Sequence, residues 1–295
     1  MRILRGDCLS NALLRGLSKP PQPAAPITWL AARERLRHAA FDSIRSTLES
    51  FDVGHWPPLA ALNDRARGIS NYRGAPLRFV APEDDAASAQ HYELRIAQHG
   101  LIATRENWHD LFNAAVWLTF PRTKSAISEM HARLIKQRGP GELKQRSTQR
   151  DVLTLFDEGG VIVVSDDPQL LELLRGFCWK ELLWERRATL AQHLRIHVFG
   201  HALLEKMLTP YVGITAKAIC LDASPARLDD AATIENLDAR LAAQFLDPHN
   251  LASTRMLAPL PILGLPGWHT HIQNAAFYDD RNYFRRGYTQ QPKVQ

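Results

Sequence analysis

The segment from Thr104 to Lys124 constrains the fold most, because it brings polar side chains into an otherwise apolar helix. At helical spacing, its inward stripe consists of Trp108, Leu111, Phe112, Ala115, Val116 and Thr119. A second row, formed by Arg105, His109 and Asn113 at i, i+4 spacing, leads into the apolar stretch around Trp117. A helix that is apolar nearly all round is buried on most sides. We therefore expect Trp117 in the core and the polar row at the bottom of a cleft.

Length and composition are those of an ordinary soluble protein. The chain has 295 residues, of which 45% are apolar and 23% charged, so it can form a packed core. Its 36 Lys and Arg against 31 Asp and Glu give a net charge of +5, which favours anionic partners. No block of five or six like charges occurs, so a nucleic acid is only one candidate beside an anionic small molecule.

The cysteines and the termini bear on where the chain resides. Cys8, Cys178 and Cys220 are far apart and form no CxxC pair, which fits a reducing cytoplasm. No uncharged run reaches the roughly 20 residues that a membrane span needs. Residues 1–26, which end in the Pro-rich stretch KPPQPAAP, are expected to be a flexible leader and linker, residues 27–286 one domain, and 287–295 a disordered tail.

The pattern of apolar runs predicts an α+β fold, in which several helices cover a small, largely antiparallel sheet and the C-terminal tail is irregular. The predicted strands are 152–156, 161–164, 194–199 and 214–221. The short link Asp157-Glu158-Gly159-Gly160 predicts an antiparallel hairpin between the first two. Residues 92–96 and 101–103, which flank His99-Gly100, are expected to form a second small hairpin or an extended lead-in to the next helix. Helices are predicted over 28–48, 125–137, 168–175, 201–208 and 229–245.

His109, Asp110 and Asn113 are the first candidate site residues. Histidine titrates near neutral pH, and Asn113, one turn further along the helix, can orient it. Such a group can transfer protons or form one end of a metal site. The alternative is a buried histidine and asparagine that satisfy each other in the core.

His201 and Glu205 form the second candidate group, one turn apart at the start of a helix that follows a predicted strand. A His/Glu pair at this spacing can bind a metal or move a proton. The HVFGH motif is no helical zinc pair, because His197 belongs to the strand and the Glu of HExxH is missing. The alternative is an imidazole that is hydrogen-bonded in the core.

Three cations are candidate substrate-binding residues. Arg122 and Lys124 flank Thr123 at a predicted helix start, where charge and free backbone N–H groups can bind phosphate, and Arg105 belongs to the polar row. The alternative is a solvated turn capped by Thr123. No P-loop, GxGxxG or GxSxG motif occurs, so nucleotide-dependent and serine-hydrolase chemistries are unsupported.

Several blocks of sequence resemble the bacterial domain-of-unknown-function 3025 family. The blocks are ENWHDLFNAAVWLTFPRTK, RDVLTLFDEGG, VFGHALLEKMLTPYVGITAKAI and LPILGLPGWHTHIQNAAFYDDRNYFR, in that order between Pro26 and Arg286. The resemblance implies a bacterial, single-domain protein. It carries no activity with it.

The residues support two function classes. The first is an acid–base or metal-assisted hydrolase-like enzyme that acts on an anionic, phosphate-type substrate, with a divalent metal as a candidate cofactor. The second is a non-catalytic module that binds a polyanion or a protein. The first requires one shared site, so it predicts that the His109 and His201 imidazoles lie within about 8 Å of each other.

Overall fold

The computed structural model describes residues 27–51, 55–82, 91–139, 141–224, 227–269 and 274–287. The predicted leader, and the predicted tail from residue 288 onward, lie outside this part of the chain. The α- and π-helices are α2 (Trp29–Arg35), α3 (Arg45–Glu49), α4 (Leu59–Arg65), α6 (Tyr92–His99), α7 (Trp108–Thr119), α8 (Pro121–Arg138), α9 (Gly141–Lys144), α10 (Thr148–Gly159), α11 (Pro168–Arg175), η2 (Glu181–Glu185), α12 (Arg187–His193), α13 (His201–Met207), α14 (Leu228–Ala231) and α15 (Ile234–Leu246). The strands are β1 (Arg78–Val80), β2 (Leu101–Ala103), β3 (Gly160–Ser165), β4 (Leu194–Val198), β5 (Thr215–Asp222) and β6 (Ala258–Pro261).

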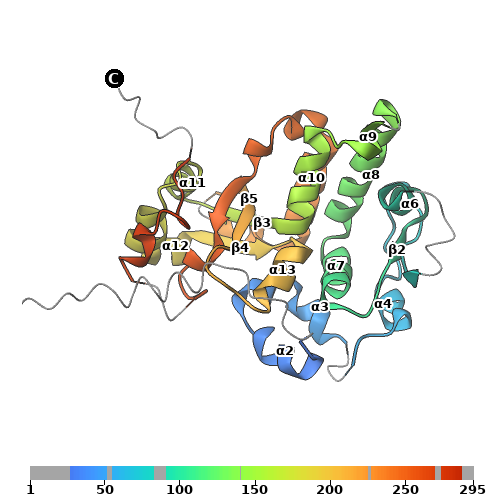
Figure 1. Cartoon of the computed structure of the whole chain (residues 1–295), viewed down its shortest axis with the longest axis horizontal. Helices are drawn as coiled ribbons and strands as arrows, with labels where there is room; N and C mark the ends of the chain where they lie inside the picture. The colour runs from blue at the N-terminus through green and yellow to red at the C-terminus, as the bar shows by residue number, and fades with distance from the viewer. Residues whose placement is uncertain are drawn as a thin grey trace, which may run out of the picture.

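Two small sheets are covered by helices, which confirms the α+β class (Figure 1). The larger sheet has the strand order β4-β3-β5-β6. Its outer pairs, β3–β4 and β5–β6, are antiparallel, whereas the central pair β3–β5 is parallel, with Ile162 opposite Ile219. The smaller sheet is the parallel pair β1–β2. The pairing is therefore mixed, because the chain passes through β4 before it returns as β5 beside β3.

Both predicted hairpins are wrong. Residues 152–156 lie within helix α10, which ends where β3 begins at Gly160. Val152, Leu153 and Phe156 are buried at helical spacing, and Ser147 caps the helix through a bond from Arg150 N. Residues 92–96 likewise belong to helix α6 rather than to a strand. Short apolar runs fit both periods, and here the cap and the buried face favour the helix.

The remaining helices agree with the predictions in place and differ in extent. Thr28 caps α2 by accepting a bond from Ala31 N, but the predicted helix over 28–48 is divided into α2, the 3-10 helix Ala39–Ile44 and α3. Helix α8 begins at Pro121, four residues before its predicted start, since proline suits the first turn of a helix. It meets α7 at Phe120.

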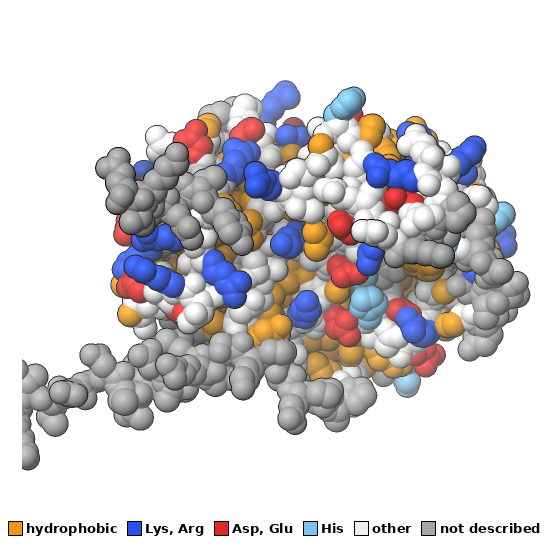
Figure 2. Space-filling model, turned by 45° about the horizontal axis from the view of Figure 1, so that its top comes forward, with side chains coloured by type: hydrophobic (Ala, Val, Ile, Leu, Met, Phe, Trp, Pro, Cys, Tyr) orange, Lys and Arg blue, Asp and Glu red, His pale blue; other side chains and the backbone are white. Residues whose placement is uncertain are grey.

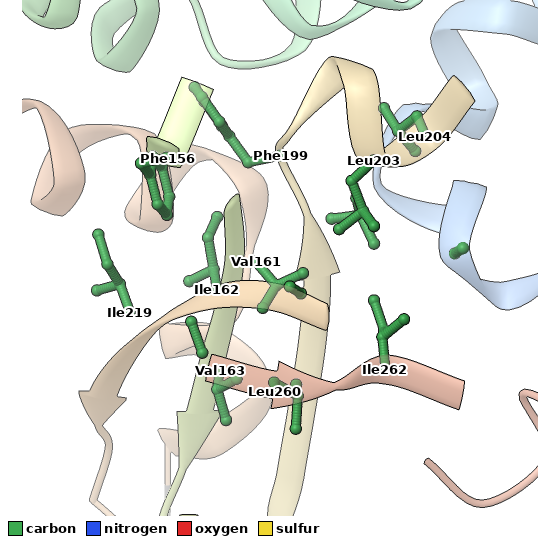
Figure 3. Packing of buried hydrophobic residues seen from close by; sticks show 14 of the residues in the cluster. Phe156, Val161, Ile162, Val163, Phe199, Leu203, Leu204, Ile219, Leu260 and Ile262 are labelled. Atoms are coloured by element: carbon green, nitrogen blue, oxygen red, sulfur yellow. The ribbon is translucent and has the colours of Figure 1, made fainter. Parts of the chain in front are cut away.

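The main apolar core lies between the larger sheet and its helices (Figure 3). All six residues of β3 are buried, and Phe156 stacks on Phe199 at a centroid distance of 4.8 Å. Trp117 is 1% exposed, as predicted, and belongs to a second, smaller cluster that includes Phe79 and Ile102. No helix among the described residues has both the length and the hydropathy to cross a bilayer.

The helices to the right of the sheet in Figure 1 determine where a site can form. Helices α10 and α13 lie next to the sheet, α7 and α8 follow, and α6 lies beyond them beside β2. Helix α13 packs on α7, and α10 packs on both α8 and α13. Polar side chains on the facing surfaces of these helices are therefore brought together away from the sheet.

Candidate functional site

A cleft of about 710 Å³ opens between α6, α7, α8, α10 and α13. The polar row of α7 lines it, as the sequence predicted, through Arg105, His109 and Asn113. The other polar side chains that line the cleft are His91, Tyr92, Glu93, Asp110, His131, Arg146, Arg150, Thr154, Asp157, Glu158 and His201. On the face drawn in Figure 2, histidine and acidic side chains lie side by side in one region, whereas Lys and Arg are spread over the whole face without a continuous basic stripe.

Buried polar rows on α8 and α10 complete the cleft. Lys124, Ser128 and His131 follow each other at i, i+4, i+7 spacing on α8, and each is less than 5% exposed. On α10, Arg150 and Asp157 are seven residues apart, as Lys124 and His131 are on α8, and they therefore lie on one face of the helix. Two neighbouring helices thus turn polar faces, not apolar ones, toward each other at this end.

Lys124 and Asp157 form the central ion pair of the cleft. Lys124 Nζ lies 2.5 Å from Asp157 Oδ1 and also donates to Asn113 Oδ1 at 2.8 Å. Burial raises the pKa of Asp157, but the charge of Lys124 and the hydrogen bond from it act in the opposite direction, and the net pKa is lowered. Asp157 therefore remains anionic, and Lys124 is already neutralised by a partner of its own chain.

His201 is held beside this pair in the neutral state. It is 7% exposed, and its Nδ1 lies 3.7 Å from Asp157 Oδ2, without a hydrogen-bond partner in the described part of the chain. Burial lowers its pKa to about 4. The absence of a side chain at Gly200 lets the chain pass close to the end of α10 just before His201. A Cβ at residue 200 would lie 2.5 Å from the Glu158 carbonyl oxygen.

His109 has the opposite protonation tendency. Its Nδ1 lies 3.0 Å from Glu205 Oε2, and this hydrogen bond raises the pKa of His109. The His109 and His201 rings meet edge to face, with centroids 4.6 Å apart. They therefore meet the 8 Å requirement for a shared site. Glu205 comes from the same helix as His201 but pairs with His109 instead.

Glu93 of α6 is a further carboxyl group of the cleft that the sequence did not single out. Its Oε2 accepts a bond from Ser128 Oγ at 3.3 Å. Burial, and then the negative charge of Asp157, raise the pKa of Glu93. The cleft thus holds two carboxyl groups whose pKa values are shifted in opposite directions, downward for Asp157 and upward for Glu93.

Neither Asp110 nor Asn113 forms a hydrogen bond with His109 in the described part of the chain, although the sequence had suggested that Asn113 could orient this ring. Asn107 caps α7 through Asp110 N, and the Asp110 carboxylate binds Arg105 through its backbone N–H at 2.9 Å and its Nε at 2.8 Å. Asn113 holds Lys124 and contacts the Tyr92 hydroxyl. Both residues line the cleft, yet their bonds order the helix end and the ion pair.

Arg122 is the one predicted site residue that the structure separates from the rest. Its side chain is exposed and lines a different hollow beside Asn71 and Tyr72. The backbone N–H groups of Arg122 and Thr123 bind the Asp238 carboxylate, at 3.0 and 2.7 Å. A carboxylate of the chain itself thus takes the position at the helix start that the sequence analysis had assigned to a phosphate.

Metal ligation finds little support among the residues that the structure describes. No group of three or more His, Cys, Asp or Glu side chains there is arranged to hold an ion. His109, His201 and Glu205 converge, but His109 and Glu205 already bond each other. These side chains fit proton transfer better than the ligand set of a structural or catalytic metal.

Fold and site together define an α+β protein with a polar cleft between helices that is lined by several titratable side chains. The family model of DUF3025, described as a protein of unknown function, matches residues 77–288. The chain belongs to this family, as the resemblance of its four sequence blocks implied. No curated protein and no solved structure matches the chain.

Proposed function

We propose that the cleft is the active site of an acid–base enzyme that hydrolyses a small anionic substrate. The observation that carries the proposal is the pair of imidazoles 4.6 Å apart whose pKa values are displaced in opposite directions. Titratable neighbours held in different protonation states are the arrangement that general acid–base catalysis requires.

His109 serves as the general acid in this proposal. Because Glu205 accepts the bond from Nδ1, the protonated ring offers the proton of Nε2 to a leaving group. His201 remains neutral and accepts a proton from the attacking water, and the anionic Asp157 stabilises the imidazolium that forms. Because the two rings are in edge-to-face contact and both line the cleft, the substrate lies beside them in the cleft, where it can contact both.

The size and the lining of the cleft support a small polar substrate. About 710 Å³ is within the range of roughly 300–1,000 Å³ typical of small-molecule sites. Arg105 and Lys124, which the sequence analysis assigned to the substrate, pair with Asp110 and Asp157. In the proposal these two cations order the catalytic groups, and other residues bind the charge of the substrate.

A panel of chromogenic substrates tests the proposal. The full chain would be assayed with p-nitrophenyl phosphate, bis-p-nitrophenyl phosphate and p-nitrophenyl acetate, with and without EDTA, Mg²⁺, Mn²⁺ and Zn²⁺. We expect turnover of an anionic ester that both His109→Gln and His201→Gln abolish, and that the exposed control His249→Gln retains. Turnover that survives in both cleft variants would contradict the assignment.

A non-catalytic binding module is the second candidate. It is favoured by three internal ion pairs, Arg105–Asp110, His109–Glu205 and Lys124–Asp157, which order these side chains without any ligand. Saturable binding of an anion to the cleft, with no turnover of any panel substrate under any metal condition, would support the binding module over the enzyme.

A further inference from the structure

Some of the cationic side chains at the cleft form ion pairs, and others do not. Arg105 pairs with Asp110, Lys124 with Asp157, and His109 with Glu205. Arg146 and Arg150 also line the cleft, yet neither forms an ion pair within the part of the chain that the structure describes. Two guanidinium groups, four residues apart, are thus left without a carboxylate at one end of the cleft.

Arg150 is the more unusual of the two, because it is only 3% exposed. Its Nε donates to His131 Nδ1 at 3.1 Å, and its Nη1 donates to the Glu142 carbonyl oxygen at 2.5 Å. Both acceptors are uncharged. A buried cation is costly unless an anion compensates it. This guanidinium forms no direct ion pair among the described residues, and Glu142 and Glu93 act on it only through their charge from beyond ion-pair distance.

The neighbouring carboxyl groups are engaged elsewhere. Glu142 Oε1 accepts a bond from Ser147 N, and Glu93 Oε2 accepts from Ser128 Oγ. Arg146 adds a second positive charge and donates to the Thr154 hydroxyl, again a neutral group. Burial, and also the positive charge of Arg146, lower the pKa of Arg150, so the two guanidinium groups repel each other, and a bound anion would relieve this repulsion.

His131 contributes a neutral donor at the same place. Burial, followed by the charge of Arg150, lowers its pKa to about 3, so the ring is uncharged at neutral pH. Since Nδ1 accepts the bond from Arg150, the single ring proton is on Nε2. His131 lines the cleft and is therefore a hydrogen-bond donor that places no further positive charge there.

We infer that Arg150, Arg146 and His131 form an anion subsite that binds a tetrahedral, doubly charged oxyanion such as the phosphate group of a substrate. Two planar guanidinium forks suit the oxygens and the charge of phosphate better than those of a single carboxylate. The inference deepens the proposed function by naming the group that the substrate presents, and it rests on that function for the identity of the cleft. The subsite replaces Arg122 and Lys124, the phosphate ligands that the sequence had suggested.

Binding of inorganic phosphate tests the subsite independently of turnover. The full chain would be titrated by calorimetry at constant ionic strength with phosphate, sulfate and acetate in separate experiments. We expect saturable binding of phosphate, and acetate bound at least about tenfold more weakly, because it offers one charge and two oxygens.

Variants locate the binding site. Arg146→Gln is exposed and should fold normally, and Arg150→Lys retains the charge but loses the fork. Each should weaken phosphate binding by about tenfold or more. Arg122→Gln, an exposed cation on α8 outside the cleft, is the matched control and should leave the affinity unchanged.

The outcomes separate this inference from the proposed function. Failure to bind phosphate, equal affinity for acetate, or an effect of Arg122→Gln as large as that of Arg146→Gln would overturn the subsite. Phosphate binding that depends on Arg146, without turnover of any substrate, would uphold the subsite and overturn the hydrolase. Turnover that depends on His109, in a protein that does not bind phosphate, would uphold the hydrolase and overturn the subsite.

Discussion

The two faces of helix α10 differ in what they bury, since one is apolar and the other carries charged side chains. Phe156 lies in the apolar core, is fully buried, stacks on Phe199 and packs against Phe245 in a tilted arrangement. Asp157, the next residue, lies in the cleft and pairs with Lys124. One face stabilises the protein through apolar burial, whereas the other buries charges that must be compensated.

The difference shows where stability and function compete. Replacing a buried ion pair with apolar side chains is often neutral or stabilising. A cleft that retains Lys124, His131 and Arg150 in buried positions, with Asp157 half-buried, therefore lacks a simple stability rationale, and a role in binding or catalysis supplies one. The following predictions test this contrast.

Truncation on the apolar face should have the largest effect on stability. Phe156→Ala should lower the free energy of unfolding by about 3–5 kcal/mol, because it leaves a cavity in a packed core. Trp117→Ala should cost a similar ~3–5 kcal/mol in the second cluster. Urea denaturation measures both, and a loss below about 1 kcal/mol would show that these side chains are not packed as described.

The ion pair of the cleft should behave differently from the core. Lys124→Met or Asp157→Asn alone should cost up to about 3–5 kcal/mol, since each leaves a charge without its partner. The double variant should recover at least ~2 kcal/mol of that loss while remaining inactive. Denaturation of all four proteins gives the coupling energy, and strictly additive losses would contradict a coupled pair.

Acid should destabilise the protein through its neutral buried histidines. His201 and His131 have folded pKa values of about 4 and about 3, below the unfolded value of 6.5. Their contribution is complete above pH 6.5 and is lost as the pH falls toward the folded values, on the order of 3 kcal/mol for His201. Thermal melts between pH 7 and 4 should show a smaller decline for His201→Asn than for the wild type. An unchanged decline would mean that His201 is protonated in the folded state.

The smallest effect on stability is expected at His109. Its side chain is 42% exposed, and an exposed pair such as His109–Glu205 contributes at most about 1 kcal/mol. His109→Gln should therefore melt nearly like the wild type and yet lose roughly 10²–10⁴-fold in turnover. A large loss of stability with unchanged turnover would make His109 a structural residue.

Local patterns predicted much of this architecture, but not the pairing of distant segments. The polar row of α7, the burial of Trp117 and the start of α2 at Thr28 each follow from helical spacing or capping. The run 152–156 has apolar residues at positions that suit a strand or a helix face, and its assignment depended on Ser147 as a cap. The parallel β3–β5 pair requires a connection through β4 that no local pattern encodes.

The sequence indicated the cleft residues of α7 and α13 but not those of α10. His109, Asn113 and His201 stand out because they interrupt apolar surroundings. Arg150 and Asp157 belong to an amphipathic helix, where polar residues normally face water. Only the packing of α10 against α8 and α13 turns that polar face inward, and only side-chain geometry shows that Glu205 reaches His109 rather than His201.

The protonation states of His109 and His201 test the central claim most directly. In an NMR titration of the imidazole C–H resonances, assigned through His109→Gln and His201→Gln, His109 should titrate above 6.5 and His201 near 4. Each resonance should also shift when the other ring titrates, because the ring centroids are 4.6 Å apart. If both histidines titrate independently near 6.5, the cleft does not separate their pKa values, and the acid–base account is contradicted.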